Sequence, residues 1–138
     1  MNGVIVAQKL ESLGRCLDRL REKAPRSLSE LEADIDLQDI IAINLERAVQ
    51  LCVDIASMAL AVTNRPPPQS MSDGFRALAE EEIISRKLAD QLVRAVGFRN
   101  LAVHAYDKID WAIVYSLLEN DLGDLRAYGR AISERIEK

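Results

Sequence analysis

Apolar residues recur at intervals of three and four positions through most of this chain, and this spacing places them on one face of an α-helix. The first such stripe predicts a helix from about residue 3 to residue 23, ended by Pro25. Ser27-Leu28-Ser29-Glu30 has the spacing of a capping box, which predicts a second helix start. That helix is expected to break near Asp34 to Asp36 and then to resume with a wide apolar face as far as Leu60.

Three consecutive prolines between Asn64 and Pro68 cannot continue a helix, so they predict the main loop of the chain. The pattern beyond this loop predicts a short helix over 72–80, a longer one over 83–103 and a last one over 108–136. No alternation typical of strands competes with this reading. We therefore expect an all-α fold, an antiparallel bundle of four to five helices, in a single domain spanning residues 1–138.

Composition limits the partners of such a chain. The 138 residues carry a formal charge of −4, so the average surface repels nucleic acid and anionic lipid, and any RNA contact must be local. Cys16 and Cys52 stand singly in apolar helical patterns, which favours buried reduced thiols over a disulfide or a metal site. The sequence contains no secretion signal and no membrane-spanning run, so we expect a cytoplasmic protein. We also expect no metal and no cofactor.

The most informative segment is Phe98-Arg99-Asn100-Leu101-Ala102-Val103-His104-Ala105-Tyr106, which holds the only histidine. A guanidinium binds phosphate oxygens and an imidazole moves protons near neutral pH, so Arg99 and His104 are suited to phosphate chemistry. On an unbroken helix, positions 99 and 104 would be about 140° apart and positions 104 and 106 about 160° apart. Either the helix ends or distorts here, or a second copy of the chain completes the site. A dimer would also supply two copies of His104, one for a base and one for an acid.

The motif Arg99-x4-His104-x-Tyr106, with Asn100 after the arginine and Gly97-Phe98 before it, resembles the signature of the HepT toxins of the HEPN superfamily. The resemblance extends to the order of helices, the proline break and the phrase Phe75-x2-Leu78. It implies a metal-independent endoribonuclease of a toxin–antitoxin pair that acts as a homodimer. It also implies a partner, a minimal nucleotidyltransferase antitoxin of the MntA kind that transfers AMP from ATP onto the motif tyrosine.

The resemblance assigns roles by position. Arg99 would hold the scissile phosphate, His104 would act as general base or acid, and Asn100 would orient one of these groups. Tyr106 occupies the place of the modified tyrosine, where an attached nucleotide would add charge and bulk beside His104. A supporting acid on the second long helix is expected to be Asp54, with Glu46 as the alternative.

Other interpretations remain open. His104 and Arg99 could simply complement the end of a helix, and Tyr106 could be a half-buried packing residue. A rival function is a non-catalytic helical binding subunit that partners a nucleotidyltransferase, and a plain dimerisation domain is a third. If the chain does bind RNA, affinity must come from a small basic zone, so we expect weak, salt-sensitive binding or a structured substrate such as tRNA. That zone consists of Arg86, Lys87, Arg94 and Arg99.

Overall fold

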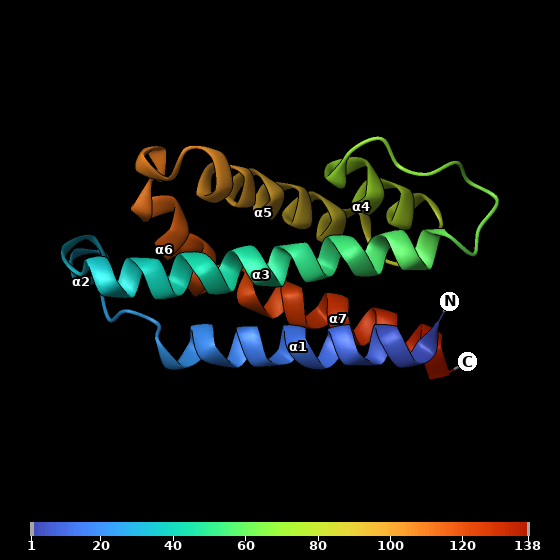
Figure 1. Ribbon diagram of the computed structural model, residues 1–138, viewed down its shortest axis with the longest axis horizontal. Helices are drawn as coiled ribbons and strands as arrows, with labels where there is room; N and C mark the ends of the chain where they lie inside the picture. The colour runs from blue at the N-terminus through green and yellow to red at the C-terminus, as the bar shows by residue number, and fades with distance from the viewer. Residues whose placement is uncertain (1, 138) are drawn as a thin grey trace.

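The computed structural model describes residues 2–137 and confirms the all-α antiparallel bundle. Helices α1, α3 and α5 run side by side along the molecule, and α7, which packs against α1 and α5, is seen between α1 and α3 and behind them (Figure 1). Both termini lie at one end of the bundle, and α2 and the turn after α5 lie at the other. Within the described residues the elements are α1 (Gly3–Glu22), α2 (Leu28–Ala33), α3 (Ile35–Leu60), α4 (Met71–Glu80), α5 (Arg86–His104), the 3₁₀-helix η1 (Tyr106–Lys108), α6 (Trp111–Asn120) and α7 (Leu122–Glu137).

The early helix boundaries follow from their capping residues. Ser27 Oγ accepts a hydrogen bond from the Glu30 N–H at 3.1 Å, while the Glu30 carboxylate accepts one from the N–H of Arg26 at 3.3 Å. This is the predicted capping box, with its return bond one residue earlier than the usual pattern. Asp34 ends α2 and caps α3 through the N–H of Leu37, at 3.0 Å, so the predicted break lies where the acidic residues stand.

The core is centred on α3, which packs against α1, α4 and α5. Tyr128 of α7 is fully buried, donates a hydrogen bond to the Cys52 carbonyl at 2.8 Å and meets the ring of Phe75 edge to face at 5.9 Å. These contacts tie α7 and α4 to α3. Cys52 is buried as expected, whereas Cys16 is only half-buried, and both thiols are free.

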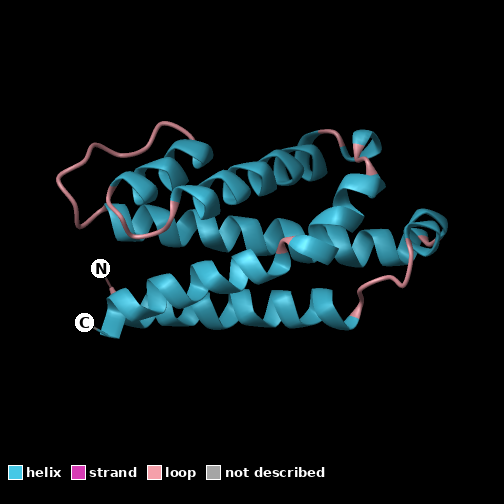
Figure 2. Ribbon diagram, turned by 180° about the vertical axis from the view of Figure 1, so that it is seen from behind, coloured by secondary structure: helices cyan, strands magenta, loops and turns pink. Residues whose placement is uncertain are grey.

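Segment 61–70, which contains the prolines, runs as the long loop between α3 and α4 (Figure 2). The connection between α4 and α5 is a tight turn. The N–H of Ile83 donates a hydrogen bond to the Leu78 carbonyl at 2.9 Å, and the N–H of Glu82 donates one to the Ala79 carbonyl at 3.0 Å. This is a Schellman motif, and it requires a left-handed residue at Glu82, whose φ is 59°.

We expect Glu82→Gly to stabilise the protein by about 1 kcal/mol, because glycine adopts this left-handed conformation without steric cost. The contact of Arg135 with Glu82 uses the backbone carbonyl and survives the change. Chemical denaturation should show a higher midpoint for this variant. Glu81→Gly is the matched control, since Glu81 has φ −82° and should lose stability or stay unchanged. Equal effects at both positions would contradict the argument.

The last part of the chain departs from prediction, since the single helix expected over 108–136 is wrong. After η1 the chain is extended at Ile109, α6 begins at Trp111 with Asp110 as its cap, and α6 ends before Asp121. Asparagine and aspartate have low helix propensity, which favours a helix end at Asn120-Asp121. Ile113, expected in the core, is 64% exposed. The longer helix also begins later than residue 83, at Arg86, because Ser85 caps it through Leu88.

None of the helices in the described part of the chain is both long and apolar enough to cross a membrane.

Candidate active site

The end of α5 decides how the motif residues are presented. The N–H of Ala105 still bonds to the Leu101 carbonyl at 2.8 Å, but Ala105 itself has φ −152° and ψ 56°, which are not helical angles. The helix therefore ends at His104, and the chain turns into η1 with Tyr106 as its first residue. The sequence left open either a helix end within the motif or completion of the site by a second copy of the chain. For Tyr106, the structure shows a helix end.

Arg99 continues the core-facing side of α5, because it follows Ala95 and Val96 by one helical turn. Its Nε is buried and has no hydrogen-bond partner among the described residues. Its Nη1 donates to Asn100 Oδ1 at 3.3 Å, and the residue as a whole is half-buried. Nε is thus enclosed by the protein, while among residues 2–137 the rest of the guanidinium donates only to Asn100, which leaves N–H groups able to bind an anion.

His104 is the last residue of α5 and is exposed. Arg99 and His104 remain on one helix, so their side chains leave its axis about 140° apart and about 7.5 Å apart along it. One chain therefore presents the two groups on different sides of α5. Neither is sealed in the interior.

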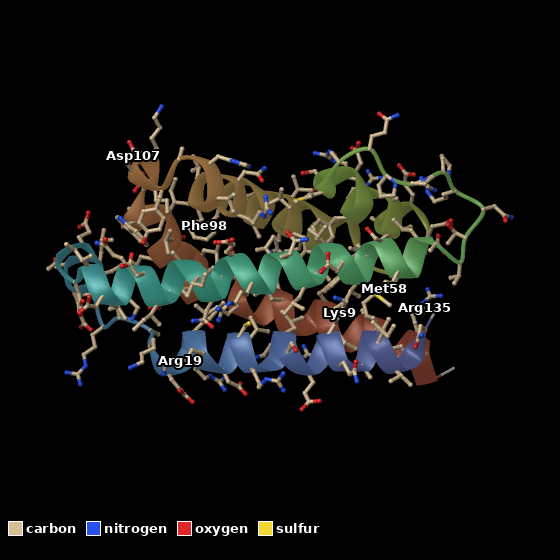
Figure 3. The ribbon with its side chains drawn as sticks, viewed as in Figure 1. Lys9, Arg19, Met58, Phe98, Asp107 and Arg135 are labelled. Carbon is tan, nitrogen blue, oxygen red and sulfur yellow. The ribbon has the colours of Figure 1, made fainter. Side chains whose placement is uncertain are left out.

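Tyr106 is turned toward α3 instead of continuing α5. Its hydroxyl donates a hydrogen bond to Asp39 Oδ1 at 2.6 Å, and its ring meets that of Trp111 edge to face at 6.1 Å. Desolvation, followed by the hydrogen bond and charge of Asp39, raises the pKa of Tyr106 above its ordinary value. The residue is still 40% exposed. Figure 3 shows this corner of the molecule, with Asp107 of η1 at its outer side and Phe98 on α5.

The acids suggested from the sequence lie elsewhere on α3. Asp54 forms an ion pair with Lys9 of α1 at 3.5 Å and accepts a hydrogen bond from Gln50 at 2.9 Å. It lies fifteen residues beyond Asp39, about 22 Å along the helix, so the structure does not bring it to Tyr106. Glu46 is half-buried and forms no ion pair in the described part of the chain.

Sequence reasoning missed Asp39 and Trp111 as neighbours of Tyr106. Trp111 is close in sequence, and an aromatic pair across a turn could have suggested it. Asp39 is 67 residues away, and no local motif marks it.

An open groove of about 590 Å³ runs between α5 and α6 beside this site. Its lining is mostly apolar and includes Phe98, Leu101 and Val114, together with the charged residues Arg94 and Asp121. Gly97 and Leu101 line this groove, and His104 follows them at a spacing of four and then three residues. His104 therefore lies on the same side of α5 as the groove. Arg86, Lys87 and Arg94 of the basic zone are all exposed. The described residues contain no group of three or more His, Cys, Asp or Glu side chains that could hold a metal ion.

Sequence comparison places this architecture among known proteins. The family model described as ribonuclease HepT-like matches residues 13–132. The mRNA nuclease HepT of Shewanella oneidensis is 33% identical over 128 residues, which cover 93% of this chain and 95% of the relative. The tRNA nuclease HepT of Aphanizomenon flos-aquae is 29% identical over 130 residues, which cover 94% of this chain and 88% of that protein.

A solved structure agrees with the sequence relatives. The tri-AMPylated HEPN toxin of Shewanella oneidensis, in complex with its MNT antitoxin, superimposes with a TM-score of 0.89 at 32% identity. The match covers 97% of this chain and 99% of the toxin. Family model, sequence and structure coincide over nearly the whole chain, so this protein belongs to the HepT-like ribonuclease family.

Proposed function

We propose that this chain is a metal-independent endoribonuclease toxin of a HEPN and minimal nucleotidyltransferase pair, located in the cytoplasm. The observation that carries this proposal is the motif Arg99-x4-His104-x-Tyr106 at the open end of α5, in a chain that belongs to the HepT-like family. The two HepT relatives described above are nucleases of mRNA and tRNA, which supports RNA as the substrate class.

The residues of the motif divide the chemistry between them. A base removes the proton of the RNA 2′-hydroxyl, the 2′-oxygen attacks the adjacent phosphorus, and an acid protonates the departing 5′-oxygen. His104 is the exposed imidazole that can serve in either role. Arg99 binds the non-bridging phosphate oxygens and stabilises the extra charge of the pentacoordinate transition state. Asn100, which already accepts a hydrogen bond from Arg99, keeps the guanidinium oriented.

The active species is proposed to be a homodimer. Within one chain Arg99 and His104 leave α5 in different directions, and one imidazole cannot be base and acid at once. A second copy related by a two-fold axis would bring both residues from both chains to one cleft. The exposed apolar side chains of Leu101 and Ile113, next to the groove between α5 and α6, support an interface on this side.

Neutralisation is proposed to occur by transfer of AMP to Tyr106 from ATP, catalysed by the nucleotidyltransferase antitoxin. Tyr106 is partly exposed and lies two residues from His104. An adenylate there places a phosphodiester anion where an RNA phosphate must bind, so both binding and cleavage fall. The relative in the solved complex is a tri-AMPylated toxin, which supports this form of control.

We expect the chain co-expressed with its nucleotidyltransferase to gain one or more adenylates, all of them mapping to Tyr106. Intact-mass spectrometry with peptide mapping measures this directly. Tyr106→Phe should remain unmodified, because it lacks the accepting oxygen, while Tyr115→Phe is the matched control and should be modified normally. A chain that copurifies with the transferase, carries no AMP and cuts no RNA would instead identify a non-catalytic binding subunit.

A further inference from the structure

Asp39 of α3 contacts a residue 67 positions further along the chain. It is exposed on the second turn of α3, whereas the cap of that helix is supplied by Asp34. Its one side-chain hydrogen bond within residues 2–137 is the 2.6 Å bond from the Tyr106 hydroxyl. A short bond between a phenol and a carboxylate is charge-assisted and therefore directional. Asp39 is therefore placed to act on the hydroxyl of Tyr106.

The tyrosine is held from two directions and remains accessible. Asp39 fixes its hydroxyl from α3, and Trp111 meets its ring at an interplanar angle of 68° from the start of α6. The side chain nevertheless keeps 40% of its surface exposed. A nucleophile that is fixed but accessible suits attack by an enzyme that docks from outside.

We propose that Asp39 is the proton acceptor for AMP transfer to Tyr106, an inference that rests on the function proposed above. In this step Tyr106 Oη attacks the α-phosphorus of ATP, and a new oxygen–phosphorus bond forms. The bond from the α-phosphorus to the oxygen that bridges it to the β-phosphate breaks, and pyrophosphate leaves with the electron pair. The phenolic proton moves to Asp39 Oδ1 and is later released to water.

The chemistry of the phenol explains why a nearby carboxylate matters. Tyr106 carries its proton at neutral pH, as any phenol does, and desolvation and Asp39 raise its pKa further. A protonated oxygen is a weak nucleophile. As the bond to phosphorus forms, the phenol becomes strongly acidic and must lose that proton. A carboxylate already 2.6 Å from the oxygen takes it without rearrangement of solvent. His104 makes no hydrogen bond to this oxygen in the described part of the chain.

The test is the kinetics of AMP transfer by the cognate nucleotidyltransferase, with ATP and Mg²⁺, to the full-length chain. Asp39→Asn keeps the shape and the accepting oxygen but removes the charge, so we expect kcat to fall by roughly 100-fold. The KM for the toxin chain should stay within about twofold, since the docking surface is intact. Asp39→Glu, which restores a carboxylate on a longer side chain, should recover part of the lost kcat.

Asp36→Asn is the matched control, because Asp36 is exposed on the same helix and forms no ion pair among the described residues. It should be modified at the wild-type rate, and all variants should melt within a few degrees of wild type. A wild-type kcat in Asp39→Asn would overturn the proposal, as would Asp39→Glu being no faster than Asp39→Asn. Absence of AMP on Tyr106 in the wild-type chain would instead refute the proposed neutralisation by AMP transfer, and this inference with it.

Discussion

His104→Ala is expected to lower RNA cleavage by roughly 10²- to 10⁴-fold, the usual contribution of a positioned general acid or base. The whole effect is expected in kcat, because the imidazole moves protons and adds little to binding of the ground state. The measurement is cleavage of a labelled RNA by the purified chain in the presence of EDTA. His104 is exposed at the end of α5, so truncation removes no core packing and should leave thermal stability nearly unchanged.

Two controls make this result interpretable. Lys108→Ala changes another exposed residue just beyond the helix and should cleave at close to the wild-type rate. Wild-type activity that disappears in EDTA would contradict the metal-independent mechanism. Full activity in His104→Ala would remove this residue from the chemistry and return it to a role at the helix end.

Arg99→Ala is expected to lower cleavage by about 10²- to 10³-fold, because it removes a donor to the charge that develops on phosphate in the transition state. Arg99→Lys should recover only part of this loss, since an ammonium cannot bind two phosphate oxygens as a guanidinium does. Cleavage kinetics at several RNA concentrations separate kcat from KM, and kcat should carry most of the change.

Arg94→Ala is the matched control on the same helix, with an exposed side chain that lines the groove. Its loss should mainly weaken RNA binding, and the slope of log affinity against log salt should fall by about 1. If Arg94→Ala lowers kcat as much as Arg99→Ala does, the special role of Arg99 is lost. Thermal melting of both variants checks that the loss of cleavage in Arg99→Ala does not come from unfolding.

Local sequence patterns predicted much of the bundle correctly. The stripe of α1, the cap at Ser27, the break at Asp34 and the proline loop all lie where neighbouring residues in the sequence require them. The prediction failed for the last helix, because apolar spacing continues through Asn120-Asp121 although the backbone does not. Periodicity measures which side chains share a face, and it does not detect where one helix ends and the next begins.

The candidate site also contains residues that local patterns predicted and residues that they did not. Arg99 and His104 were predicted from their side-chain chemistry, and Asn100 and Tyr106 from the resemblance of one short motif to the HepT signature. The supporting acid expected at Asp54 forms an ion pair with Lys9, whereas Asp39, which no motif marked, accepts the hydrogen bond of Tyr106. Each lies on the same long helix, and only the packing of α5 and η1 against α3 distinguishes them.

The sequence by itself determined the all-helical class, the capped boundaries and the candidate site residues at the end of α5, because these depend on residues close together in the chain. The tertiary structure alone decided that Tyr106 turns back to α3 and that its hydroxyl donates a hydrogen bond to Asp39. The physical reason is that a contact across 67 residues arises from the packing of whole helices, which no local pattern of residues encodes.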